Sequence, residues 1–335
     1  MSITIKDIAK IAKVSHTTVS RALNDSPFIN EATKKNIIEI SKQLNYVPNF
    51  NAKSLVLNKS YNIGLFFTSI NQGTTAGFFH EVIEGVNSVV KNNYNIVIRG
   101  IDDYEDYTPF DNKRFDGIIM ISQSESDNDF IYDVYHKHIP MVVLNREINE
   151  NNIVNILSSD NDGSYNAVNY LIQKGHKDIA IIKGKQDFKS SEDRKDGYFR
   201  AMLQSKLKIK DEYIATGEYN IESGYTAMKK LLDAEPLPTA VFCSNDDMAV
   251  GAIKAIIDRG YKVPEDVSIV GYDNSSFCSY ITPSLTSVKK QTKEFSVRGA
   301  EILLKLISGE EVEKKKIYID TELIIRESVR KLMSN

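Results

Sequence analysis

From Tyr61 to the end of the chain, short apolar runs rich in β-branched residues alternate with longer segments of helical periodicity. This alternation is typical of β-α-β units, whose strands pair in parallel and whose helices cover both faces of a sheet. The runs predict strands at 62–68, 95–99, 117–122, 141–145, 179–184, 240–244 and 267–273. Because these strands are too many for one compact sheet, the sequence predicts an α/β fold with two similar, doubly wound subdomains.

The chain is expected to cross between the two subdomains three times: near 158–160, around 287–291 and within a final strand at 317–325. The first subdomain then comprises residues 61–158 and 288–319, and the second comprises 159–287 and 320–335. Ligands of open α/β sheets bind beyond the carboxyl ends of the strands. Two facing subdomains are therefore expected to form a cleft there.

Polar residue pairs stand where predicted strands or crossings end. Carboxylates, amides and guanidinium groups can each pair two adjacent hydroxyls, which is what a polyhydroxylated ligand requires. An aromatic residue, Phe78, Phe79 or Tyr219, can supply an apolar face for a ring. Loop capping explains any single pair, but four pairs at one topological position favour a binding site. The pairs are Asn145-Arg146, Asp160-Asn161, Asn245-Asp246 and Asp273-Asn274.

Three short helices are predicted in residues 4–44. Apolar residues recur at helical spacing over 5–12. A second helix, from His16 to about Asn24, has Ser15 as its N-cap, and a third, over 31–44, has Asn30. The small Ala9 and the tight turn after the first helix indicate a helix-turn-helix, whose second helix enters the major groove of DNA.

The second helix presents polar side chains that suit a DNA duplex. Arg21 can donate two hydrogen bonds to guanine O6 and N7. His16 and Thr17 are expected to read neighbouring bases, and Thr18 and Ser20 to contact phosphates. A solvated helix face explains Arg21 alone, but the cap, the turn and the apolar pattern agree with a DNA-reading helix.

The distribution of charge supports the same interpretation. The whole chain has a net charge of -3, which by itself argues against a nucleic-acid partner. Residues 1–60, however, contain nine Lys and Arg against four Asp and Glu, a net charge of +5. The remainder contains 33 basic and 41 acidic residues, a net charge of -8, so the basic character is confined to the helical segment.

Residues 46–57 predict a short hinge. Pro48 ends the third helix, and Asn49 can cap a new one. A helix of two turns is marginal alone in water, so this segment is expected to fold only where a partner chain and DNA order it. The predicted organisation is a helix-turn-helix domain at 1–47, a hinge helix and linker at 48–60, and an α/β core at 61–335.

Residues 2–60 resemble the DNA-binding headpiece of the lactose/galactose-repressor (LacI/GalR) family. The resemblance rests on T-I-K-D-I-A at 4–9, V-S-x-x-T-V-S-R at 14–21 and Y-x-P-N-x-x-A-x-S-L at 46–55. It implies a homodimer on palindromic operator DNA, with Leu55 wedged into the central base step. The DNA-contacting residues that it implies are Thr4, Ser15, His16, Thr17, Thr18, Ser20, Arg21, Asn24, Asn49, Ala52, Lys53 and Leu55.

The same resemblance extends over the core, as a two-lobed fold like that of periplasmic binding proteins. It rests on F-F at 78–79 with Gly85, D-N-x-G at 160–163, G-Y-D at 271–273 and P-x-L-T at 283–286. The run at 190–198 supplies an effector-contacting arginine as Arg194, and L-N-R at 144–146 resembles galactose-type repressors most. The effector-binding residues that the resemblance implies are Phe79, Asn145, Arg146, Arg194, Tyr219, Asn245 and Asp273.

Other classes of protein find little support in the sequence. It contains no G-x-S-x-G, P-loop, H-E-x-x-H or G-x-G-x-x-G, so we expect no enzyme, no catalytic residue and no cofactor. Cys243 and Cys278 lack metal-ligand spacing, so no metal site or disulfide is expected. The start of the chain lacks the apolar region of a signal peptide, and no apolar run would span a membrane. We therefore expect a cytoplasmic, nucleoid-associated protein.

The predicted function is a sequence-specific DNA-binding transcriptional regulator, a repressor of carbohydrate uptake or utilisation genes. A small sugar or sugar derivative, bound between the two subdomains, is expected to control its affinity for the operator. Two alternatives stay open at this point: a repressor of the same fold that responds to a purine or a phosphorylated metabolite, and a sugar-binding receptor without a DNA role.

Overall fold

The computed structural model describes residues 3–23, 26–44, 46, 59–103, 114–150 and 152–332. It divides the chain into two compact units, Met1–Lys59 and Ser60–Asn335, called here the helical unit and the α/β unit. The predicted hinge up to residue 58, with Asn49, Ala52, Lys53 and Leu55, lies outside the described residues, as does Asn24.

The helical unit consists of α1 (Ile5–Ala12), α2 (His16–Leu23) and α3 (Glu31–Gln43). Local capping defines their ends: the Ser15 hydroxyl accepts a hydrogen bond from the Thr18 N–H at 3.1 Å, and Asn30 Oδ1 accepts one from the Thr33 N–H at 2.8 Å. The three predicted helices and both predicted caps are thus confirmed. A small core holds the helices together, formed by Ile8, Ala9, Val19, Ala22 and Ile37.

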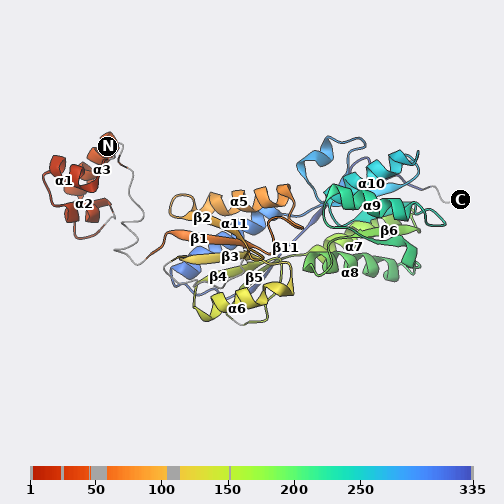
Figure 1. The fold of residues 1–335 in the computed structure, drawn as a ribbon, viewed down its shortest axis with the longest axis horizontal. Helices are drawn as coiled ribbons and strands as arrows, with labels where there is room; N and C mark the ends of the chain where they lie inside the picture. Colours follow the sequence, from red (N-terminus) through yellow and green to blue (C-terminus); the bar gives the residue numbers. More distant parts are fainter. Residues whose placement is uncertain are drawn as a thin grey trace. The chain divides into compact units, whose positions relative to one another are not determined.

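The first lobe of the α/β unit is a six-stranded parallel sheet with the strand order β11-β5-β4-β3-β1-β2 (Figure 1). Its strands are β1 (Asn62–Phe67), β2 (Asn95–Gly100), β3 (Gly117–Ile121), β4 (Met141–Leu144), β5 (Val154–Ser158) and β11 (Lys316–Ile319). Helices α5 (Ala76–Val90) and α11 (Thr292–Ile307) pack on one face, and α6 (Asn128–His136) packs on the other.

The second lobe repeats this topology with the strand order β12-β10-β9-β8-β6-β7. Its strands are β6 (Ile179–Lys183), β7 (Ile214–Thr216), β8 (Ala240–Cys243), β9 (Ser268–Asp273), β10 (Thr286–Lys289) and β12 (Glu322–Ile324). Helices α7 (Asp160–Gln173) and α8 (Lys189–Gln204) cover one face, and α9 (Ile221–Leu231) and α10 (Asp246–Asp258) cover the other. Short 3-10 helices occur at Glu125–Asp127, Asp211–Tyr213 and Ser276–Ser279.

All seven predicted strands are confirmed, but β5, β7 and β10 were not among them. The chain changes sheets within 317–325, as expected, but the prediction of one continuous strand there is wrong, because β11 and β12 belong to different sheets and β12 pairs antiparallel with β10. The chain passes from one sheet to the other at 320–321 while still extended, so an uninterrupted strand pattern covers two strands.

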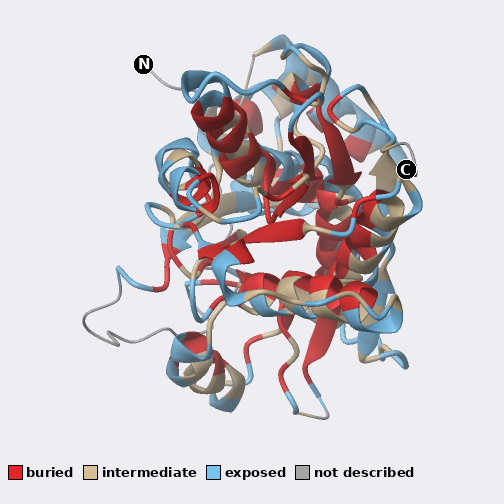
Figure 2. Cartoon of the chain, turned by 90° about the vertical axis from the view of Figure 1, so that its right-hand side faces the viewer, coloured by how far each residue is buried: buried red, intermediate tan, exposed pale blue. Residues whose placement is uncertain are grey.

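Helices on both faces leave the central strands buried, as the red segments of Figure 2 show. The buried polar residues depart from this apolar pattern, and many of them follow the carboxyl end of a strand. Such groups cost free energy to bury unless they are paired, so their position at strand ends marks a functional region. They include Ser122, Asn145, Arg146, Asp160, Ser244, Asn245, Asp246 and Lys290.

Candidate functional site

A cavity between the two lobes, called here the charged cavity, is lined by residues of both. The first lobe contributes Phe67, Thr68, Gly73, Thr74, Thr75, Phe78, Ile121 and Gln123, and the second contributes Ser190, Arg194, Tyr219, Asn245 and Asp273. Lys290 completes the lining from the segment that follows β10 and leads back to the first lobe. The cleft predicted beyond the strand ends therefore exists, and side chains of opposite charge line it.

Arg194, on α8, is the most heavily bonded cation of the charged cavity. Its guanidinium donates to the Ser244 carbonyl at 2.6 Å and to Asp160 Oδ2 at 3.2 Å, and it lies 3.4 Å from Asp273 Oδ1. It also stacks 3.8 Å from the centre of the Tyr272 ring. Burial alone would lower the pKa of Arg194, but the Asp160 and Asp273 carboxylates raise it, so this guanidinium stays charged.

Asp246, three residues after β8, is a buried acid of the second lobe, and Asp273, the last residue of β9, is a partly buried one. Burial and then the Asp273 charge raise the pKa of Asp246 to about 7, although Ser287 Oγ donates to its carboxylate at 2.6 Å. Burial raises the pKa of Asp273 to about 6, against the opposing effect of Arg194. These two acids therefore change protonation near neutral pH, unlike ordinary exposed carboxylates.

The backbone around the cavity adopts the left-handed conformation at several residues other than glycine. Asn145 has φ of 72°, Tyr219 has 61° and Asp273 has 101°. A side chain at such a φ costs free energy, and residues of this kind persist where surrounding contacts enforce them, often at ligand sites. The cavity is thus held in shape by the folded lobes before any ligand enters.

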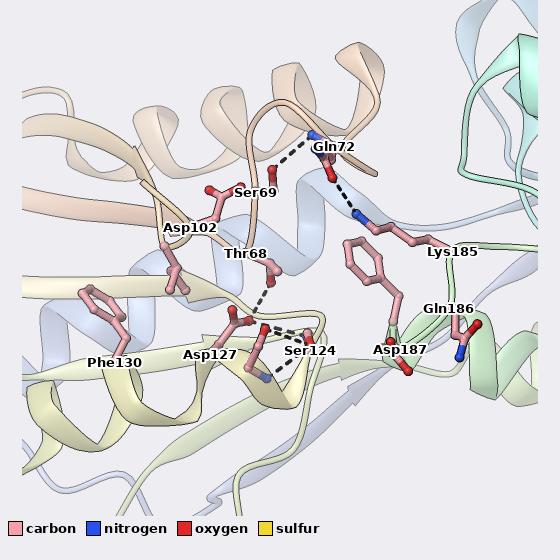
Figure 3. Close-up of a pocket in the computed structure, with 13 residues that line it drawn as sticks. Thr68, Ser69, Gln72, Asp102, Ser124, Asp127, Phe130, Lys185, Gln186 and Asp187 are labelled. Atoms are coloured by element: carbon pink, nitrogen blue, oxygen red, sulfur yellow. Dashed lines mark hydrogen bonds between the residues drawn. The ribbon is translucent and has the colours of Figure 1, made fainter. Parts of the chain in front are cut away.

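A second interlobe cavity, called here the wide cavity, has a volume of about 520 Å³ and shares Thr68 with the charged cavity. Figure 3 shows Gln72 of the first lobe pointing toward Lys185 of the second, and their side chains form a hydrogen bond of 3.2 Å. On the first-lobe side, Asp127 accepts from Thr68 Oγ1 at 2.6 Å. The lobes therefore already touch beside the wide cavity.

Four of the seven predicted effector residues line the charged cavity: Arg194, Tyr219, Asn245 and Asp273. Asn145 lies behind it and accepts a hydrogen bond from Lys290 at 3.0 Å.

Phe79 and Arg146 do not line the charged cavity, and their predicted contact with the effector stays a prediction. Phe79 packs against Phe67 with ring centres 5.1 Å apart, and its neighbour Phe78 lines the cavity instead, since adjacent helical residues point in different directions. Arg146 donates to Ser122 Oγ at 3.0 Å and to Asn128 Oδ1 at 2.6 Å, both in the first lobe.

The sequence interpretation missed several lining residues, of which Lys290 is the most distinctive. Lys290 directly follows β10, and Thr68 and Gln123 follow β1 and β3 by one and two residues. The expectation that polar residues just after a strand line the cavity holds for all three. It does not single out Lys290 in the sequence, because β10 lacks a clear strand pattern.

In the helical unit, α2 carries the residues predicted to contact DNA. His16, Thr17 and Arg21 are exposed, and Thr18 and Ser20 are half-buried. Val19 and Ala22, on the opposite face, belong to the small core. The outward face of α2 is therefore polar and accessible, as a recognition helix requires. Two further predicted contacts within the described residues, Thr4 and Ser15, are exposed just before α1 and α2.

In the part of the chain that the structure describes, His, Cys, Asp and Glu side chains form no group of three that could hold a metal ion. None of the helices in this part is long and apolar enough to cross a membrane. Cys243 and Cys278 are both buried as free thiols, and burial raises both thiol pKa values.

A helix-turn-helix unit joined to a two-lobed α/β core with a polar interlobe cavity defines a ligand-controlled DNA-binding regulator. Comparisons with known proteins agree. The family described as "Bacterial regulatory proteins, lacI family" matches residues 4–49, and the "Periplasmic binding protein-like domain" family matches residues 168–329.

Curated relatives match along nearly the whole chain. The "Probable HTH-type transcriptional repressor ExuR" of Bacillus subtilis is 55% identical, over 98% of this chain and 99% of that protein. The "HTH-type transcriptional repressor PurR" of Histophilus somni is 37% identical, over 98% of this chain and 99% of that protein. Among solved structures, the Lac repressor dimer bound to operator and the anti-inducer ONPF superposes with a TM-score of 0.83 at 25% identity, covering 98% of this chain and 100% of that one.

A second solved structure, the complex of the transcriptional regulator CelR with cellobiose, has a TM-score of 0.74 at 27% identity, over 97% and 99% of the two chains. The chain belongs to the lacI family of bacterial regulatory proteins. It is a DNA-binding transcriptional repressor with a small-molecule effector. The resemblance read from the sequence motifs is thereby confirmed, as are the predicted fold class and this function.

Proposed function

We propose that the chain represses genes of carbohydrate uptake or utilisation, and that a sugar or sugar derivative in the charged cavity controls its affinity for operator DNA. The observation that carries this proposal is the lining of the cavity from both lobes by carboxylate, amide, hydroxyl and guanidinium groups. These groups pair adjacent hydroxyls, and Phe78 and Tyr219 offer ring faces. The CelR structure, a complex with cellobiose, supports a carbohydrate as the kind of ligand that this fold binds.

The DNA contacts that we propose follow from the exposed face of α2. Arg21 donates to a guanine, His16 and Thr17 read adjacent bases, and Thr18 and Ser20 contact phosphates. Thr4 and Ser15 contribute from the starts of α1 and α2. The proposed contacts outside the described residues are Asn24, Asn49, Ala52, Lys53 and Leu55.

The proposed working state is a homodimer on a palindromic operator, as in the Lac repressor dimer bound to operator. We assign residues 1–47 to the DNA-binding domain, 48–60 to the hinge and 61–335 to the effector-binding core. Within the core, we assign residues 61–158 and 288–319 to the first lobe. We assign residues 159–287 and 320–335 to the second lobe. Because its partner is the bacterial chromosome, the chain works in the cytoplasm on the nucleoid, and it acts by binding rather than as an enzyme.

Control of operator affinity follows from linkage between the two sites. A ligand that prefers one arrangement of the lobes increases the population of that arrangement. The arrangement sets the spacing of the two hinge segments in the dimer, and this spacing alters operator affinity. Reciprocity requires that operator binding change the affinity for the ligand by the same factor.

The test combines operator selection with ligand titration. Full-length protein should select palindromic duplexes from a random double-stranded library, and calorimetry should detect binding of a sugar or sugar derivative. The selected operator, in a fluorescence anisotropy assay with that ligand, should show a changed dissociation constant. If a nucleobase binds and no sugar does, the effector is a purine and the sugar proposal is wrong. Failure to select any duplex would contradict the DNA role.

A further inference from the structure

We propose that the effector carries an acidic group, a carboxylate or a phosphate, and that Lys290 binds this group in the charged cavity. This inference rests on the proposed function, because it concerns the same ligand, and it narrows that ligand from a sugar in general to an acidic one. The evidence is the unusual environment of Lys290 and of the donors beside it.

Lys290 is a buried lysine, 5 % exposed, and none of the described carboxylates lies within hydrogen-bond distance of its ammonium. Among the described residues its ammonium donates a single hydrogen bond, to the neutral Asn145 Oδ1 at 3.0 Å. An ammonium has three donors, and Lys290 otherwise lies against the rings of Phe78 and Phe295, 5.3 and 5.6 Å from their centres. Burial lowers the pKa of Lys290, as expected for a charge with too few partners.

The nearest acid does not satisfy Lys290. Asp160 Oδ2 lies 3.9 Å from the ammonium, beyond hydrogen-bond distance. The Asp160 carboxylate already accepts from Ser158 at 2.6 Å, from Tyr272 at 3.0 Å and from Arg194 at 3.2 Å. A lysine whose role was only structural would be paired with such an acid, because an unpaired buried charge costs several kcal/mol.

Two further buried groups near Lys290 have unused donors. In the described part of the chain, neither Asn145 Nδ2 nor Arg194 Nε has a hydrogen-bond partner. The orientation of the Asn145 amide is determined, because its oxygen must face the ammonium of Lys290, which can only donate. An ammonium, an amide N–H and a guanidinium N–H call for a ligand group that only accepts and is negatively charged.

The charged cavity also has acceptors for the rest of such a ligand. Gln123 Oε1 has no partner among the described residues, and Asp273 accepts only a long hydrogen bond from Arg194 at 3.4 Å. Both line the cavity with Ser190 and Tyr219, which carry hydroxyls. A molecule with an acidic group at one end and several hydroxyls matches this set of partners, as an acidic sugar does.

The first experiment compares ligands that differ only in the acidic group. Titration calorimetry of the full-length protein would use glucose, galactose and mannose, the uronate and aldonate of each, and the 6-phosphate of each. We expect an acid to bind at least about tenfold more tightly than its neutral parent. If the uronates or aldonates bind more tightly than the 6-phosphates, the acidic group is a carboxylate; the reverse order indicates a phosphate.

The second experiment changes the lysine. Lys290→Met should weaken binding of the preferred acid by about tenfold or more while leaving the affinity for its neutral parent nearly unchanged. The matched control is Lys289→Met, the same change one residue away at a lysine that does not line the charged cavity. Tighter binding of a neutral sugar than of its acid, or no binding of any acid or phosphate tested, overturns the proposal.

Operator binding is measured in parallel. If operator affinity responds only to neutral sugars, the proposed function stands and this inference fails. If no operator is bound, the proposed function fails by itself.

Discussion

Arg21 of the helical unit and Arg194 of the α/β unit are the same residue type in opposite environments. Arg21 is exposed at the end of α2. Arg194 is 3 % exposed and lies within 3.4 Å of two carboxylates. The first must find its partner on another molecule, whereas the second already has its partners inside the fold.

The difference follows from the size of the two cores. Among the described residues, the helical unit packs around five buried apolar residues, and its buried cation Lys34 pairs with an exposed carboxylate, that of Glu31. Each lobe of the α/β unit has a sheet buried between helices, so the lobes can hold charges and left-handed backbone in place. Exposed residues therefore suit a large, charged partner such as DNA, and the buried ones suit a small ligand.

The largest effect on stability is expected from Arg194→Ala. Loss of the guanidinium removes the nearest cation from the buried Asp160 and the partly buried Asp273, which should lower the free energy of unfolding by about 3 to 5 kcal/mol. Denaturant unfolding measures this change. The control is Arg146→Ala, because Arg146 is equally buried but donates to neutral oxygens, and its loss should cost about 1 to 3 kcal/mol. Equal losses would contradict the role given to the charge pairs.

A core substitution in the helical unit tests whether that unit folds separately. Ile37 is 0 % exposed, so Ile37→Ala should cost about 2 to 5 kcal/mol, enough to unfold so small a unit. The thermal transition of the α/β unit, followed by calorimetry, should stay where it is. The neighbouring Ile38 is 37 % exposed, and Ile38→Ala serves as the control with little expected effect. A shift of both transitions with Ile37→Ala would mean that the units stabilise one another.

Arg21→Ala tests the exposed side of the comparison. It should cost about 1 to 3 kcal/mol of operator binding and relax preference at one base pair. The free energy of unfolding should change by no more than about 0.5 kcal/mol, since Arg21 is exposed. Lys35→Ala, at another exposed cation on α3, should not relax base preference. Undiminished discrimination between operators in Arg21→Ala would remove α2 from its role as recognition helix.

The last expected effect, spread over several pH units, is a dependence of stability on pH. Burial raises the pKa of Asp246 to about 7 and that of Asp273 to about 6, above the unfolded value of about 4. Between about pH 4 and 7 the folded state therefore binds more protons, so stability falls as pH rises, by at most about 1.4 kcal/mol per pH unit for each group. In Asp246→Asn the loss of stability with rising pH should be smaller than in the wild type. Identical slopes would contradict the raised pKa.

Much of the fold could be predicted because local rules operate strongly in it. Caps at Ser15 and Asn30 and apolar spacing define the helices of the helical unit, and seven strands follow from apolar runs. The strands that were missed are short or have an atypical pattern: β7 has three residues, and β10 reads Thr-Ser-Val-Lys. The break between β11 and β12 could not be predicted, because strand partners depend on distant residues.

The candidate site was predicted in part for a related reason. Polar residues that follow a strand can be recognised in a sequence. This pattern predicted Asp160 and Asp273, which contact Arg194, as well as Asn245. Whether a side chain enters a cavity depends on its direction from the backbone, which the pattern does not contain. For this reason Phe78 replaces Phe79, and Arg146 turns toward Ser122.

The sequence by itself determined the class of the protein: a basic three-helix reader, a β-α-β core and the motifs of the lacI family. Helix caps, apolar periodicity and charge are properties of neighbouring residues, so they can be read along the chain. Only the tertiary structure decided that Lys290 lies buried between Asn145 and two aromatic rings. The environment of a charge depends on residues far away in the chain, and an ammonium with few hydrogen-bond partners is informative only because it is buried.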